Sequence, residues 1–236
     1  MPTLTRSPTE TADLLSLAVH EFRTPVTVVA GYLRMLAKAQ AGPLAERQLA
    51  LILEAEKSCA RLTALVAELS DLASLEGATA ALAREDVVLD PIVDEVIASV
   101  TEGRDRGITV ARDQSVPTPP VAGDRKRLRD IVQALLGAVL REQSAPLTVI
   151  VHTGTRVIDG TPMVVMGIGA GDSSRKVLDQ ADRTDVRLNE ARGGLGMALP
   201  IARRVVEQLG GRVWSSATER AIGSIALVLP VRESTA

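Results

Sequence analysis

The sequence predicts two domains of different fold class: a helical hairpin over residues 7–77 and a two-layer α/β sandwich over residues 86–232. The first segment places apolar residues at alternating spacings of three and four, which is typical of amphipathic helices. The second segment alternates short helical and extended apolar runs, separated by Gly and Pro. With 236 residues, the chain is long enough to bury two small cores.

Two long helices are expected in the first segment, on either side of a break at Ala41-Gly42-Pro43. Ser7-Pro8-Thr9-Glu10 has the pattern of a helix start with a capping box. The stripes are too apolar for one hairpin to bury alone, so we expect a homodimer that forms a four-helix bundle. The predicted seams are Leu15, Ala18, Phe22, Pro25, Val29, Tyr32 and Leu36 in the first helix, and Ile52, Ala55, Cys59, Leu62, Val66, Leu69 and Ala73 in the second.

Helices and strands are interleaved in the second segment, and the segment ends in a pair of strands. That order favours a two-layer α/β sandwich. A glycine-rich turn is expected directly after the strand at 163–166. The predicted helices cover residues 91–100, 128–140 and 197–209, and the predicted strands cover 107–111, 147–152, 163–166, 212–215 and 224–229.

Composition excludes several classes of function. The formal net charge is −2 and the chain has one Phe, one Tyr and one Trp, which disfavours nucleic acid as a partner. No apolar run approaches the ~18 residues that span a bilayer, and the N-terminus lacks the apolar stretch of a signal peptide, so we expect a cytoplasmic protein. Cys59 has no metal-site spacing around it and is interpreted as a small core residue, and no metal site is predicted.

The segment from His20 to Pro25 is the sharpest local feature. If Phe22 belongs to the buried seam, His20 lies on the exposed side of the helix, with Thr24 one turn further along the same face. A neutral imidazole is a good nucleophile, and the adjacent Glu21 can accept its proton. Pro25 costs roughly 3 kcal/mol inside a helix. A residue that is locally unfavourable close to a candidate functional residue is typical of a functional site.

Residues 15–33, LSLAVHEFRTPVTVVAGYL, resemble the dimerisation and phosphotransfer helix of the two-component histidine kinase family. The resemblance implies that His20 is phosphorylated, that Glu21 is the base and that Thr24 positions water in a phosphatase reaction. It also implies a response-regulator receiver domain as the partner.

The resemblance continues to the C-terminus. Residues 193–214 are similar to the second glycine box of the family and the helix after it, and residues 223–230 to its closing strand. A sandwich of the histidine kinase ATPase type is implied, in which Gly169, Gly171, Gly194 and Gly196 approach nucleotide phosphates.

Two nucleotide motifs of the family are damaged. Ala138 and Ala134 stand at the Asn positions of the asparagine box, and Gly167 stands at the Asp of the first glycine box. Neither Ala nor Gly offers a side-chain oxygen to Mg²⁺ or adenine. The losses predict nucleotide binding weakened by about 10²- to 10⁴-fold, which argues against ordinary dependence on ATP and Mg²⁺. The remaining glycines are retained either for the nucleotide or for the fold.

Three functions stay open at this point. The first is phosphotransfer between His20 and a response-regulator aspartate without ordinary autophosphorylation. The second is an active ATP-dependent histidine kinase in which water or other side chains replace the missing Asp and Asn. The third is a non-catalytic scaffold, a pseudokinase that binds a regulator or another kinase through its bundle. Whether the chain is an enzyme therefore stays open as well.

Overall fold

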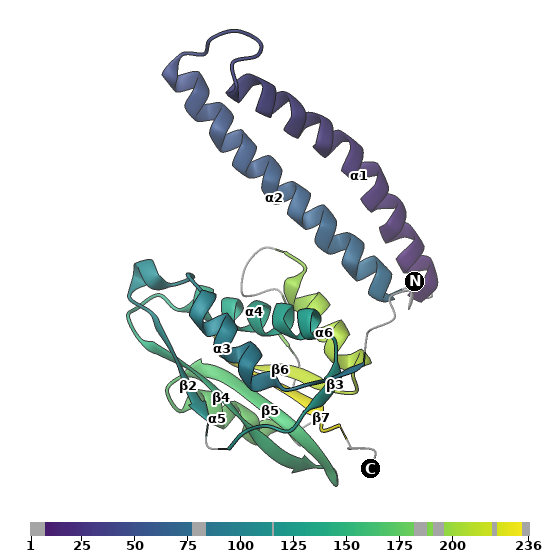
Figure 1. Cartoon of the computed structure of the whole chain (residues 1–236), viewed down its shortest axis with the longest axis vertical. Coiled ribbons are helices and arrows are strands. Elements are labelled where there is room, and N and C mark those ends of the chain that lie inside the picture. The colour runs from purple at the N-terminus through teal and green to yellow at the C-terminus, as the bar shows by residue number, and fades with distance from the viewer. Residues whose placement is uncertain are drawn as a thin grey trace, which may run out of the picture. The chain divides into compact units, whose positions relative to one another are not determined.

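The computed structural model describes residues 8–76, 84–114, 116–181, 188–190, 196–218 and 221–232. The chain divides into two compact units, Met1–Ala81 and Leu82–Ala236. The first is a helical hairpin and the second a mixed sheet with helices (Figure 1), which confirms the predicted fold class. In the part of the chain that is described, no helix has the length and apolar character needed to cross a membrane.

The hairpin consists of α1 (Pro8–Ala37) and α2 (Glu46–Glu76), which run side by side in opposite directions (Figure 1). The proposed cap at Ser7 lies outside the described residues. The connection at residues 38–45 reverses the chain through two residues with positive φ, Ala39 at 54° and Gly42 at 108°. At the start of α2 the Gln48 side chain accepts a hydrogen bond from the Ala45 amide at 2.9 Å, which satisfies a free N–H at this end.

The seam between the two helices differs from the predicted one in α1. Val19, not Phe22, is buried against α2, while Phe22 and Tyr32 are 57% and 64% exposed. In α2 the prediction holds at Cys59, whose Sγ lies 3.5 Å from the Val26 carbonyl oxygen, but Leu62 is exposed. Helix α1 carries two apolar stripes, and the one that contains Ala12 and Val19 is buried while the one that contains Phe22 and Val29 is exposed. Periodicity alone does not say which stripe faces the neighbour.

The second unit contains a five-stranded sheet with the order β2-β4-β5-β7-β6, in which β2 pairs with β4 in parallel and the other pairs are antiparallel. Sequence patterns missed a two-stranded ribbon of β1 and β3, whose strands have only three residues each. The strands are β1 (Glu85–Val87), β2 (Thr109–Gln114), β3 (Val121–Gly123), β4 (Thr148–Ile158), β5 (Thr161–Ala170), β6 (Arg212–Thr218) and β7 (Ala221–Pro230).

Three helices cover one face of this sheet, α3 (Leu89–Ser99), α4 (Arg125–Glu142) and α6 (Ala198–Gln208) (Figure 1). All three were expected from the apolar periodicity. A buried carboxylate joins this layer to the sheet. Asp90 on α3 accepts hydrogen bonds from the Thr118 amide at 2.7 Å and the Thr153 hydroxyl at 3.2 Å. It also pairs with Arg112 of β2 at 2.6 Å.

The opposite face of the sheet is covered by a short segment that sequence patterns did not predict, α5 (Ser173–Lys176) followed by the 3₁₀ turn η2 (Val177–Gln180) (Figure 1). Val177 and Leu178 join a core cluster with Val165, Val228 and Trp214. The Trp214 indole N–H donates to the Val177 carbonyl at 3.0 Å, which ties the turn to β6.

Gly167 and Gly169 let α5 lie directly on the strand. The expected glycine-rich turn after residue 166 is wrong, because both glycines lie within β5 and pair with β4 and β7. A Cβ atom at Gly167 would be 1.8 Å from the Ser174 carbonyl oxygen, and one at Gly169 would be 2.5 Å from the Ser173 hydroxyl. No side chain fits there unless α5 moves.

Replacing Asp90 by Ala is expected to lower the free energy of unfolding by about 3–5 kcal/mol, because it leaves the largely buried Arg112 without its partner in the core. Asp94→Ala is the matched control: Asp94 pairs with the same arginine at 2.6 Å but is 60% exposed. The control is expected to cost less than about 1 kcal/mol. Urea unfolding followed by circular dichroism measures both. Equal losses would contradict the role given to burial.

Gly167→Ala is expected to destabilise the second unit by more than about 2 kcal/mol, because its methyl group collides with backbone. Gly154→Ala, on the same sheet face, is the control, since the nearest atom to a Cβ there is the His152 ring nitrogen at 3.7 Å. The control should be neutral or slightly stabilising. Thermal unfolding compares the two, and a Gly167→Ala chain as stable as the wild type would show that α5 does not pack here.

Candidate functional site

His20 lies on the exposed surface of α1, as the periodicity predicted. Its side chain is 80% exposed, while the preceding Val19 is buried against α2. Successive residues on a helix are about 100° apart, so the burial of Val19 turns His20 away from the partner helix and into solvent. The helix thus presents an imidazole that a second protein can reach.

Glu21 lies beside the imidazole on the same helical turn. Its Oε1 atom is 3.7 Å from His20 Nδ1, longer than a hydrogen bond but within ion-pair distance if the ring is protonated. Both side chains are largely exposed. Because Nδ1 faces the carboxylate, Nε2 is the ring nitrogen left open to an approaching group.

Thr24 is exposed one turn beyond His20, and α1 continues without interruption through Pro25. Pro25 has no amide hydrogen, so the Glu21 carbonyl loses its usual helical donor. Two residues later the Thr27 hydroxyl donates to the Arg23 carbonyl at 2.8 Å, which gives one carbonyl near the proline an additional partner. The structure therefore brings His20, Glu21 and Thr24 together on one stretch of exposed helix.

The positions expected to carry nucleotide-binding side chains are directed to different sides of the sheet. Ala138 is fully buried in α4, and Ala134 is half-buried one turn earlier on the same helix. A side chain at Gly167 would point at α5, which covers the sheet face opposite to α4 (Figure 1). An aspartate at residue 167 does not fit in this arrangement, and Ala138 has no side-chain oxygen to offer a metal ion.

The four glycines expected to approach phosphates have different surroundings. Gly169 is closed in by α5, as described above. Gly171 has a φ of +50° in the turn between β5 and α5, and Gly196 a φ of +135° two residues before α6. Gly194 lies outside the described residues. Packing of α5 accounts for Gly169, and a left-handed turn for Gly171, without a nucleotide.

A charged cluster that sequence reasoning missed joins α5 to the edge of the sheet. Arg175 Nε donates to Asp113 Oδ2 at 2.8 Å, and His152 Nδ1 lies 3.2 Å from the same oxygen. Hydrogen bonding from Arg175, assisted by His152, holds the pKa of the Asp113 carboxyl below its ordinary value, although burial opposes this. The partners are 39 and 62 residues apart in sequence, so no local pattern reveals them. His152 packs as a half-buried strand residue, and among the described residues no group of three or more His, Cys, Asp or Glu side chains is arranged to hold a metal ion.

Comparison with known protein families finds a match within the helical hairpin. Residues 11–78 match the His Kinase A (phospho-acceptor) domain. The chain is 26% identical over 210 residues to the signal transduction histidine-protein kinase BarA of Escherichia coli, covering 86% of this chain and 22% of that protein. It is 28% identical over 213 residues to the circadian input-output histidine kinase CikA of Synechococcus elongatus, covering 87% and 28% respectively.

The fold of both units also has a solved counterpart. Full-length ShkA, whose crystal structure is a complex with AMPPNP, matches 95% of this chain with a TM-score of 0.69 and 24% identity, over 47% of its own length. The chain spans about a quarter of the curated relatives that it matches. The helix that carries His20 thus lies within a match to the His Kinase A (phospho-acceptor) domain, and most of the chain is similar to two-component histidine kinases.

Proposed function

We propose that this chain transfers a phosphoryl group between His20 and an aspartate of a response-regulator receiver domain. The observation that carries the proposal is the exposed His20–Glu21 pair on an unbroken helix, within the stretch that matches a phospho-acceptor domain. A receiver domain must bring its aspartate to the imidazole, and the exposure of His20 allows that approach.

The transfer follows from the geometry of the pair. His20 Nε2 attacks the phosphorus of an aspartyl phosphate, the bond between phosphorus and the carboxylate oxygen breaks, and the carboxylate leaves. Glu21 faces Nδ1 and takes up the proton that the ring releases. The reverse reaction returns the phosphoryl group to an aspartate. Thr24 is placed to orient a water molecule against the phosphorylated ring when the reaction is hydrolysis.

We further propose that this transfer does not depend on ATP bound by the chain's own second unit. AMPPNP is bound by ShkA, but the residues of this chain do not fit the nucleotide in the same way. Gly167 has no room for the adenine-binding aspartate because the Ser174 carbonyl lies in its place, and Ala138 has no metal ligand. In this proposal the phosphoryl group comes from a phosphorylated partner.

The active form in this proposal is a dimer of hairpins. Much of one face of α1 consists of large apolar side chains that the hairpin leaves exposed, among them Phe22, Val29 and Tyr32. Exposed apolar patches of this kind mark association surfaces. A second hairpin that covers them completes a four-helix bundle and leaves His20, about 160° around the helix from Phe22, accessible.

His20→Ala is expected to abolish transfer. Receiver domains encoded in the same genome are loaded with radiolabelled acetyl phosphate, freed of excess reagent and mixed with the chain. Acid-labile label should appear on the wild type and fall by more than about 10²-fold in His20→Ala, because the nucleophile is gone. His152→Ala removes the only other histidine and should keep the label. Label that persists in His20→Ala would refute the proposal.

The same proteins incubated with Mg²⁺ and γ-labelled ATP test the second part of the proposal. We expect no label above the His20→Ala background. Label that requires His20 would instead show an active ATP-dependent kinase, and it would mean that other groups replace the side chains lost at Ala138 and Gly167. Absence of transfer from every receiver domain, with a folded chain, would favour a scaffold.

Val29→Glu is expected to weaken the dimer by at least about 100-fold, because it places two unpaired carboxylates in an apolar interface. Ala64→Glu adds the same charge at an exposed position of α2 near Lys57 and Arg61, and should leave the dimer intact. Sedimentation velocity at micromolar concentration distinguishes the two. A monomeric wild-type chain, or equal effects of both substitutions, would contradict the assignment of this face.

A further inference from the structure

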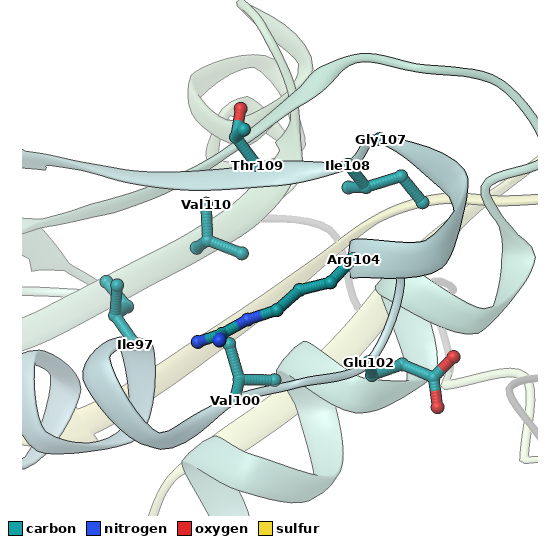
Figure 2. A pocket seen from close by; sticks show the side chains of 8 residues that line it. All are labelled: Ile97, Val100, Glu102, Arg104, Gly107, Ile108, Thr109 and Val110. Carbon is teal, nitrogen blue, oxygen red and sulfur yellow. The ribbon is translucent and has the colours of Figure 1, made fainter.

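A pocket of about 430 Å³ lies at the edge of the sheet, between the end of α3, the 3₁₀ turn η1 (Arg104–Arg106) and the start of β2 (Figure 2). Its lining is mixed: Ile97, Val100, Ile108 and Val110 provide apolar groups, and Glu102, Arg104 and Thr109 provide polar ones. It is formed by one continuous stretch of the second unit and involves none of the residues assigned to phosphotransfer.

Arg104 is the only positively charged side chain that lines this pocket. Its side chain extends along the hollow, and the guanidinium ends near Ile97 and Val100 (Figure 2). Glu102 also lines the pocket, but its Oε1 atom pairs with Arg106 Nη2 at 2.8 Å and not with Arg104. Within the described residues, no carboxylate forms an ion pair with Arg104. The pocket therefore combines several apolar side chains with an arginine that has no ion-pair partner.

The turn that carries Arg104 is held in a defined shape. Gly103 and Gly107 flank it with φ values of +82° and +71°, a backbone conformation that favours glycine. The amides of Arg106 and Ile108 both donate to the Gly103 carbonyl at 3.0 Å, and the Ile108 side chain is buried. Arg106 in addition donates to the Leu140 carbonyl at 3.1 Å, which anchors the turn to α4. The backbone that carries Arg104 therefore needs little ordering when the side chain binds a ligand.

We infer that this pocket binds a small carboxylate that carries a short apolar chain. A guanidinium presents parallel N–H donors that match the two oxygens of a carboxylate. The apolar part of the lining favours a hydrocarbon tail and disfavours an anion that lacks one, since such an anion would lose water without gaining apolar contacts. The volume falls within the range of about 300–1,000 Å³ that small-molecule sites occupy.

Hexanoate is the probe for this inference, and acetate, hexanol and inorganic phosphate are its comparisons. Titration of the isotope-labelled full chain, followed by amide NMR shifts, should show saturable binding of hexanoate with the largest shifts in residues 97–110. Acetate keeps the charge without the tail, and hexanol keeps the tail without the charge, so each should bind at least about tenfold more weakly than hexanoate. Inorganic phosphate should not compete.

Two variants assign the contributions of charge and tail. Arg104→Gln should weaken hexanoate binding at least about tenfold. Lys176→Gln, which removes one exposed positive charge from α5 on the opposite face of the sheet, should leave it unchanged. Val110→Thr keeps the side-chain shape but adds a hydroxyl, and should weaken hexanoate while leaving the weak binding of acetate unchanged.

Three results would overturn the inference. The first is hexanoate shifts that match those of acetate, because the pocket walls would then contribute nothing. The second is equal loss in Arg104→Gln and Lys176→Gln, because only overall charge would then matter. The third is preferential binding of phosphate, which would assign the arginine to a different class of anion.

Discussion

The second unit depends on one close contact between backbones, the approach of the Ser174 carbonyl to Gly167 in the middle of the sheet. Side chains normally separate a strand from a segment that packs on its face. Two glycines in β5 have no side chain, so α5 lies directly against the backbone of the strand on one face. Once α5 lies there, Val177 and Leu178 are positioned to cover the outer core, and Arg175 reaches Asp113 at the edge of the sheet. The absence of side chains at Gly167 and Gly169 thus allows α5 and η2 to cover the outer face of the sheet.

The two units depend on different kinds of interaction. The hairpin presents His20 at an exposed position of α1, and this helix continues through Pro25 five residues later. The second unit has a five-stranded sheet covered by helices, in which Gly167 and Ala138 carry no polar side chain. An architecture of this kind depends on apolar burial, whereas the binding of a ligand depends on a few polar atoms.

Sequence patterns predicted the elements whose signal is local. Both hairpin helices, the helices α3, α4 and α6, and the five strands of the main sheet follow from sequence patterns. His20 is exposed as expected, although the expectation relied on the burial of Phe22, and the structure buries Val19 instead. Other features did not follow. The stripe of α1 that faces α2 depends on the partner's shape, and β1 and β3 are too short to show a period. The path of α5 over Gly167 and the Asp113 cluster depend on contacts between residues far apart in the chain.

The Trp214 indole, which is hydrogen-bonded to η2, can also serve as an intrinsic fluorescent probe of the second unit. Trp214 is the only tryptophan of the chain, it is almost completely buried, and its ring N–H is bonded to the Val177 carbonyl. The wavelength of indole emission depends on the polarity around the ring. Departure of η2 from the sheet would therefore shift the wavelength of the protein's ultraviolet fluorescence emission. The hairpin contributes nothing to that emission band, because it contains no indole. Events at the outer face of the sheet can therefore be followed without attaching a dye.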